Sequence, residues 1–217
     1  METLTENVIT LKGSTQIVTE FFFYSINSIL YQRGIYPPES FSRESKYGLT
    51  MLVSQDEGLL EYLEQVITQI EGWLLNGSIQ RLVVVITGSD SGDTLERWVF
   101  QIEHSQSKPL EERDMNEDRS KIESKKSRKE VMNEIQAIIR QITASVTFLP
   151  LLNEPCTFDL LVYTGAEAEV PTAWEESDPQ YITNSSEVRL RSFTTKIHKV
   201  EAMVAYKVEE DDDDDEV

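Results

Sequence analysis

The sequence has few of the residues that most often carry catalysis or hold metals. Among 217 residues, one is cysteine (Cys156) and two are histidine (His104 and His198). A single cysteine excludes an intramolecular disulfide framework and a cysteine-rich zinc site. Neither histidine lies in an H-E-x-x-H or H-x-H pattern. No metal site and no other cofactor is therefore predicted.

Positive charge is also scarce. The chain has 20 Lys plus Arg against 39 Asp plus Glu, a net charge of −19. Eight acids form one run, residues 209–216, and without them the balance is still 20 − 31 = −11. Such a field repels phosphate backbones, so direct nucleic-acid binding is not expected. We expect residues 209–217 to form a disordered acidic tail.

Long apolar runs are absent too. No window approaches about 18 uninterrupted apolar residues, so no membrane span is predicted. The first residues lack the basic start and apolar stretch of a secretory signal. We expect a soluble protein of the nucleus and cytoplasm, without a membrane partner.

Glycine-rich phosphate-binding loops are missing, because neither G-x-x-x-x-G-K-[ST] nor G-x-G-x-x-G occurs. Cys156 opens an apolar run, which favours a buried, inert thiol over a nucleophile. His198 reads as a structural or surface histidine more readily than a catalytic one. Together these features favour a binding module over an enzyme, and a hydrolase using Cys156 remains a rival.

Two helices are predicted in the first third of the chain. The first runs from Ser14, as N-cap, to Arg33, and Gly34 follows it as a stop. It is apolar nearly all round, which is typical of a buried central helix. The second follows capping-box spacing at 54–57 and ends at Asn76-Gly77. Between them, residues 36–40 predict an extended loop.

A third helix is predicted after a charged loop at about 105–129. Its exposed start lies in the basic stretch 119–129, and its apolar stripe runs from Val131 to Val146. Strand patterns occupy 81–86, 96–103, 156–163, 188–193 and 200–208.

The order of these elements predicts an α+β fold, with three main helices on one face of a mainly antiparallel sheet. Residues 165–186 show no clear period, and a long non-periodic stretch in a compact domain is often functional. The edge of the preceding strand, 156–163, is a candidate to accept an extended peptide as an added strand.

Several long strings of residues resemble the HORMA domain family, and within it the spindle-checkpoint branch. They cover almost the whole chain and depart from the family at the first residues, in the charged loop and in the tail. The strings lie at 13–14, 27–37, 95–98, 140–152, 174–177, 182–185, 187–195 and 203–207.

The resemblance implies one HORMA domain over residues 1–208, followed by the tail. Its C-terminal region, about 165–208, would be a mobile "safety belt" that wraps a partner peptide against the sheet. Family members have two states. In the open state the belt covers the peptide site, whereas in the closed state the C-terminal strands occupy the opposite sheet edge and the peptide is enclosed.

The implied function is a checkpoint switch, not an enzyme, that delays anaphase. Its implied partners are the activator subunit of the anaphase-promoting complex, the kinetochore scaffold mitotic arrest deficient one, and a second copy in the other conformation. The family also implies other checkpoint-complex subunits, a remodelling ATPase, and location at the nucleus, kinetochore and cytoplasm. The alternative is a HORMA adaptor of a translesion DNA polymerase or of the meiotic chromosome axis.

Matching the strings assigns roles to individual positions. The implied peptide-binding residues are Phe158, Leu160, Val162, Tyr163 and Trp174. The implied dimer surface contains Arg140, Gln141 and Phe148, and the implied conformational switch contains Leu11, Met203, Val204 and Tyr206. Two plainer interpretations stay open: Arg140-Gln141 as an ordinary exposed helix pair, and Trp174 as a loop anchor in the core.

Overall fold

The computed structural model describes residues 9–104 and 126–208. The helices are α1 (Leu11–Gln32), α2 (Glu57–Asn76) and α3 (Arg128–Ala144), with short 3-10 turns at Pro38–Ser40 and Ser145–Thr147. The strands are β1 (Phe41–Lys46), β2 (Leu49–Ser54), β3 (Ile79–Gly88), β4 (Thr94–His104), β5 (Cys156–Thr164), β6 (Ser185–Thr194) and β7 (His198–Lys207).

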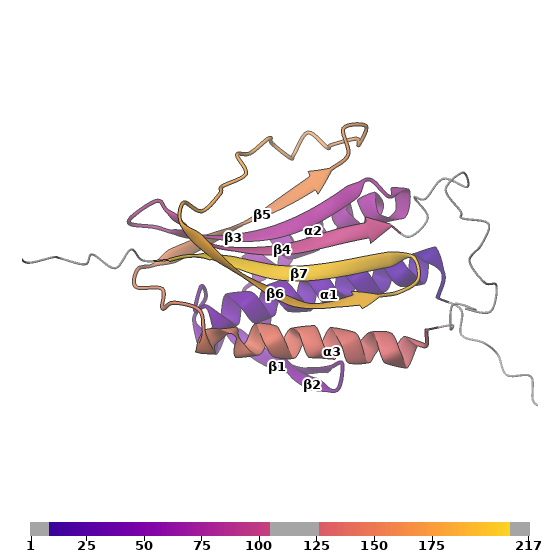
Figure 1. Ribbon diagram of the computed structural model, residues 1–217, viewed down its shortest axis with the longest axis horizontal. Coiled ribbons are helices and arrows are strands. Elements are labelled where there is room, and N and C mark those ends of the chain that lie inside the picture. The colour runs from indigo at the N-terminus through magenta and orange to yellow at the C-terminus, as the bar shows by residue number, and fades with distance from the viewer. Residues whose placement is uncertain (1–8, 105–125, 209–217) are drawn as a thin grey trace, which may run out of the picture.

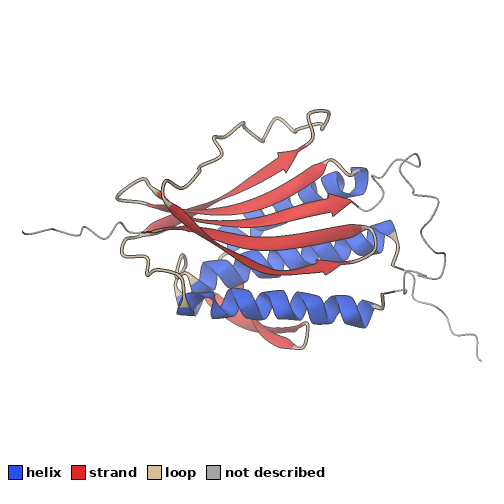
Figure 2. Cartoon of the chain, in the orientation of Figure 1, coloured by secondary structure: helices blue, strands red, loops and turns tan. Residues whose placement is uncertain are grey.

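Five strands form one antiparallel sheet in the order β5-β3-β4-β7-β6, and β1 and β2 form a separate hairpin. Helices α1 and α2 lie behind the large sheet, and α3 lies beside β6 at the sheet edge and contacts α1 (Figures 1 and 2). The predicted α+β class is therefore confirmed. The C-terminal hairpin β6–β7 lies on the β4 side, so β5 and β6 are the two sheet edges.

Helix α1 is the centre of the core, as its all-round apolar pattern predicted. Its Phe21 and Phe22 are fully buried and contact Phe100 of β4, with ring centroids 5.6 and 5.7 Å apart. Phe193 of β6 lies 4.9 Å from Phe21. Aromatic pairs at such distances add to the free energy gained by burying their area. The C-terminal hairpin thus contributes side chains to the main core.

The predicted N-cap of α1 was wrong by one turn. Thr10 is the N-cap, and its hydroxyl accepts a hydrogen bond from the Gly13 amide at 3.1 Å. Ser14 lies inside the helix and is fully buried. Both residues are good caps. Ser14 instead bonds Thr195 and His198 at the turn of the C-terminal hairpin, a long-range contact that local spacing does not reveal.

The predicted capping box of α2 was also displaced. Asp56 is the N-cap and accepts from the Leu59 amide at 2.8 Å. Ser54 ends β2 and its hydroxyl accepts from the Asp56 amide. The predicted end of the helix at Asn76-Gly77 was right. Gly77 adopts φ +73°, the left-handed conformation that glycine adopts without strain.

Helix α3 starts later than predicted and ends earlier. Ser127 and Glu130 form a reciprocal capping box, so the helix begins at Arg128, and most of the predicted basic start lies outside the described residues. Val146 was expected in the buried stripe. It lies in the 3-10 turn after the helix and is 42% exposed, because the changed helical period rotates it outward.

The β1–β2 hairpin was not predicted. Strand β1 reads Phe-Ser-Arg-Glu-Ser-Lys, and four of its six residues are exposed, so no apolar alternation marks it. Its turn, Tyr47-Gly48, has φ values of +53° and +69°. Two residues of positive φ are typical of the tight turns that connect antiparallel strands. The Tyr47-Gly48 turn was therefore the sequence feature that could have predicted this hairpin.

Candidate functional site

Strand β5 has a partner on one side only. It pairs with β3 from Gly88↔Cys156 to Ile79↔Thr164, and no strand of the described residues pairs with its other side. An edge strand offers a row of N–H and C=O groups to a further chain. The predicted edge is therefore present, and within residues 9–104 and 126–208 its outer side has no partner strand.

The side chains of β5 divide between the two faces of the sheet. Phe158, Leu160 and Val162 pack on the main core beneath the helices. Tyr163 belongs with Leu161 to a smaller cluster on the opposite face. The predicted peptide-binding set therefore borders the edge from both faces. An added strand would meet apolar side chains on each of its own faces.

Aromatic rings surround Phe158 where β5 meets the helices. Its ring centroid lies 6.2 Å from that of Tyr36 and 6.1 Å from that of Tyr62 on α2. Burial raises the pKa of both tyrosines, so both phenols stay protonated at neutral pH. Sequence reasoning missed Tyr36 and Tyr62, because only the fold brings them beside β5.

Residues 165–184, which we call the belt segment, leave β5 and cross to β6 at the other sheet edge (Figure 1). The segment is tied down near its start: the Gly165 amide donates to the Ser78 carbonyl at 2.8 Å, and the Trp73 indole donates to the Glu169 carbonyl at 3.0 Å. The rings of Trp174 and Trp73 meet edge-on at 5.0 Å. Trp174 thus anchors the belt segment to the end of α2.

The opposite sheet edge is covered. Gln141 of α3 accepts a hydrogen bond from the Arg191 amide of β6 at 2.6 Å. Glu134, also on α3, accepts from the Thr194 amide at 3.2 Å. Side chains of α3 therefore already accept hydrogen bonds from two β6 amides with which a further strand would have to pair. Gln141, predicted on the dimer surface, has this second contact within the chain.

The predicted switch residues lie in two places. Met203, Val204 and Tyr206 are on β7, opposite Val99, Trp98 and Glu96 of β4. Val204 is fully buried, whereas Met203 lies on the outer face of the sheet. Leu11 opens α1, one turn before the buried Ser14.

A buried polar cluster joins α1 to the C-terminal hairpin. The Ser14 hydroxyl is 2.7 Å from His198 Nδ1 and 2.5 Å from Thr195 Oγ1. His198 is 1% exposed and meets His104 of β4 edge-on at 5.0 Å. Burial, and then the neighbouring His104, lower the pKa of His198 to about 4. His198 is therefore a neutral, structural histidine at neutral pH.

The predicted dimer residues on α3 and after it are accessible. Arg140 is exposed, and Phe148 is 41% exposed. Val146 and Leu151, at 42% and 81%, extend this apolar surface. The surface lies at the C-terminal end of α3, where the chain turns toward β5 (Figure 1).

Cys156 is a half-buried residue at the start of β5, and its Sγ lies 3.3 Å from the Glu154 carbonyl. Burial, and then the Glu154 carboxylate, raise the pKa of the thiol, which makes it a poorer nucleophile. Cys156 pairs with Gly88 at one end of the sheet, whereas His104 and His198 pair at the other. The hydrolase rival therefore lacks its Cys–His pair.

The described residues contain no group of three or more His, Cys, Asp or Glu side chains placed to hold a metal ion. None of the described helices combines the length and apolar content that crossing a bilayer requires.

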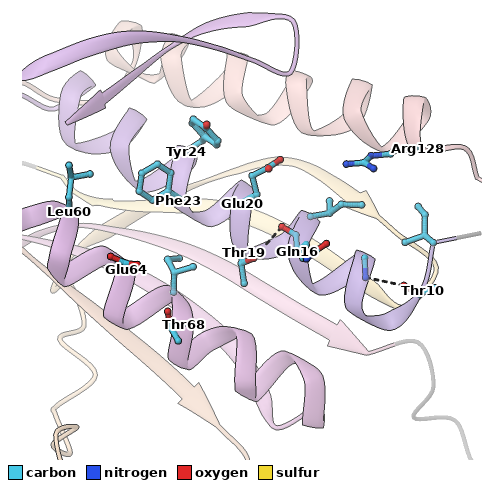
Figure 3. A pocket seen from close by; sticks show the side chains of 14 residues that line it. Thr10, Gln16, Thr19, Glu20, Phe23, Tyr24, Leu60, Glu64, Thr68 and Arg128 are labelled. Carbon is cyan, nitrogen blue, oxygen red and sulfur yellow. Dashed lines mark hydrogen bonds between the residues drawn. The ribbon is translucent and has the colours of Figure 1, made fainter. Parts of the chain in front are cut away.

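A separate hollow of about 1080 Å³ lies on the helical side of the molecule (Figure 3). Phe23, Tyr24 and Glu20 of α1 face Leu60 and Glu64 of α2 across it. It is formed by helices α1 and α2 and the start of α3, and β5 contributes no residue to it.

Comparison with known proteins identifies the class. Residues 14–198 match the HORMA domain, so the chain belongs to the HORMA domain family.

The chain is similar to the mitotic spindle assembly checkpoint protein MAD2A of Dictyostelium discoideum: 60% identity over 203 residues, which cover 94% of this chain and 95% of the relative. It is 56% identical to MAD2A of Homo sapiens, with the same coverage. It also resembles a chain in a crystal structure of the mitotic checkpoint complex, with a TM-score of 0.79, 45% identity, and coverage of 91% of this chain and 100% of that one.

Proposed function

We propose that this protein is a spindle-assembly-checkpoint switch that captures a partner peptide as an added strand on β5. The observation that carries the proposal is the unpaired β5 edge, bordered by a belt segment that is fastened at both ends. At the far end, the Val208 amide donates to the Asn184 carbonyl at 3.0 Å. A peptide between β5 and this segment would be enclosed rather than merely docked.

The strand order supports assigning this arrangement to the closed state. The hairpin β6–β7 pairs with β4, at the side of the sheet away from β5. In the open state of the family, the C-terminal region covers the peptide site instead. Two packings of one sequence that differ by a few kcal/mol form a recognised class of switch.

Each predicted binding residue then has a distinct role. Phe158, Leu160 and Val162 would receive peptide side chains on the helical face, and Tyr163 on the outer face. Trp174 would hold the belt segment against α2 while the peptide is bound. Because the belt must open before the peptide leaves, release should be slow.

We further propose that an open copy pairs with a closed copy through Arg140, Gln141 and Phe148. The exposed apolar side chains around Phe148 support this assignment, since aromatic anchors and arginine are enriched in interfaces. Leu11, Met203, Val204 and Tyr206 would change partners when the hairpin moves.

The proposed partners are the activator subunit of the anaphase-promoting complex, the kinetochore scaffold and further checkpoint subunits, together with a remodelling ATPase. We place the protein at the nucleus, kinetochore and cytoplasm, with a binding rather than an enzymatic role and one domain over residues 1–208. The polymerase and meiotic adaptors are less supported, because relatives 56–60% identical to this chain carry the checkpoint name.

The test is calorimetric titration with the binding segments of the activator and the scaffold, followed by dilution to follow release. Tight binding with slow release supports the proposal. Binding to neither peptide, together with recovery of polymerase subunits in a pull-down, would move the assignment to the adaptors.

A further inference from the structure

A groove of about 590 Å³ lies on the outer face of the sheet, opposite the helices. Its walls come from β3, β4, β6, β7 and the end of the belt segment. It contains Arg81, Arg97 and Arg189, a concentration of positive charge on a chain whose net charge is −19. The groove contains no residue of the peptide-binding set proposed above, and Met203 is the one proposed switch residue that lines it.

Arg97 is 8% exposed, yet no carboxylate of the described residues lies within ion-pair distance of it. Its guanidinium stacks on Tyr181 at 4.9 Å, and one Nη donates to the Tyr163 hydroxyl at 3.4 Å. Its Nε is buried and has no hydrogen-bond partner in the part of the chain that the structure describes. Burying a charged donor without a counter-charge is costly, so this guanidinium is suited to an anion.

Arg81 repeats the pattern beside it. Its guanidinium lies 5.0 Å from the Tyr163 ring, and its Nε is likewise buried and unpartnered. Two carboxylates, Glu187 and Glu201, also line the groove, and Glu201 is paired with Lys199 at 2.7 Å. The three arginines therefore exceed the acids that could neutralise them.

The chain carries its own anion close to this groove. Ala205 of β7 lines the groove and lies opposite Arg97 in the sheet register. The acidic run begins four residues later, at Glu209. Residues 209–217 could span roughly 30 Å if extended, so they can reach back over the groove. A tethered segment acts at an effective concentration in the millimolar range, which favours even a weak contact.

We propose that the acidic tail, residues 209–217, binds in this groove and places carboxylates on Arg97, Arg81 and Arg189. The contact needs the groove walls of β4, β6 and β7 together, so it exists only while the hairpin lies on β4. Tail binding would therefore stabilise this arrangement of the hairpin. This is opposite to the effect expected if the tail were simply repelled by the acidic body.

The test uses three chains: full length, a chain ending at Val208, and a full-length chain whose tail acids are replaced by Gln and Asn. The NMR resonances of the Arg97 and Arg81 Nε–H groups report on anions bound there. We expect both to differ between the full-length chain and the other two at 50 mM NaCl, and the difference to vanish at 500 mM, because salt screens the contact. Identical resonances in all three chains would overturn the proposal.

Variants and added peptides identify the occupant. The free tail peptide Glu-Glu-Asp-Asp-Asp-Asp-Asp-Glu-Val should restore the full-length resonances of the shortened chain, and its Gln/Asn counterpart should not. Arg189→Gln, at an exposed position, should weaken peptide binding several-fold, whereas Arg43→Gln, which removes the same charge from β1, should not. Restoration by inorganic phosphate alone, or equal weakening by both variants, would overturn the tail as the specific occupant.

Discussion

The two edges of the five-stranded sheet are built in opposite ways. At β6, the outward residues include Glu187, Arg189 and Arg191, and α3 side chains accept hydrogen bonds from the strand's amides. At β5, the side chains are largely apolar, no strand of the described residues pairs with its outer side, and the belt segment passes along the edge.

Natural proteins protect exposed strand edges with charge, cover or bulges, because an open apolar edge invites other chains. Strand β6 has charge, cover from α3 and a register shift between Arg189 and Ser192. No strand of the described residues covers the outer side of β5. The anchored belt segment passes along that side instead. This difference supports the proposal that β5 is kept available for a partner peptide.

Removing the second half of the last strand, β7, should have the largest effect on the difference between the two edges. A chain ending at Ala202 loses Val204, which is fully buried between Trp98 and Val188 in the sheet register. Burying one such side chain contributes about 1.5–3 kcal/mol, and its strand pairing is lost as well. We expect peptide binding to weaken by at least about 100-fold, or about 2.7 kcal/mol, in calorimetry. A chain ending at Val208 keeps all strands and is the control.

Lowering the pH should reduce the free energy of unfolding, because His198 is buried at the turn of the β6–β7 hairpin. His198 has a pKa of about 4 in the folded protein, below the ordinary value of 6.5, so unfolding takes up a proton between these values. The contribution of neutral His198 to the free energy of unfolding is therefore complete above about pH 6.5. It is lost as the pH drops toward 4, by roughly 3 kcal/mol in all. Urea unfolding at pH 7.5, 5.5 and 4.5 measures this.

The control for the acid effect is His198→Gln, which removes the titrating group. Its unfolding free energy should change less between pH 7.5 and 4.5 than that of the parent chain. The ring of His104 contacts that of His198, so His104→Gln is measured in parallel. An equal pH dependence in the parent and the His198→Gln chain would contradict the assignment to His198.

Loosening the belt segment should affect release more than stability. Trp174→Ala removes the edge-on contact with Trp73, worth about 0.5–1.5 kcal/mol beyond buried area. We expect peptide release to become about tenfold faster, as 1.4 kcal/mol corresponds to a factor of ten. Val170→Ala, at a 55% exposed position of the same segment, should leave the rate unchanged. Equal release rates in both variants would show that Trp174 is only a loop anchor.

The smallest effect is expected at the covered edge. Gln141→Ala removes the hydrogen bond to the Arg191 amide and should cost about 1 kcal/mol in urea unfolding. Arg140→Ala, at the adjacent exposed position, should change stability by less than about 0.5 kcal/mol. Both should weaken self-association in analytical ultracentrifugation. If Arg140→Ala leaves self-association intact, the dimer surface is wrongly placed.

Local patterns were enough to predict the helices and the main strands. The apolar spacing of α1, the stop at Gly77 and the alternation of Trp98, Phe100 and Ile102 all produced the expected elements. The resemblance supplied the family, which the match to residues 14–198 bears out.

Long-range contacts were what local patterns could not give. Thr10, not Ser14, caps α1. The Ser14 hydroxyl instead makes hydrogen bonds with Thr195 and His198, more than 180 residues away. Pairing of β7 with β4 rather than with β5 is equally invisible in strand alternation, since either neighbour suits an apolar strand. The surroundings of Phe158, including Tyr36 and Tyr62, also depend on that tertiary arrangement.

The most direct test of the account is backbone amide hydrogen exchange with and without a bound activator or scaffold peptide. Strand addition on β5 predicts strong new protection of the alternate amides in residues 157–163 that do not already bond β3. Little change is expected in β6, which pairs with β7 and whose Arg191 and Thr194 amides already bond α3. Protection that appears on β6 instead, or peptide binding without new protection on β5, would contradict capture by strand addition.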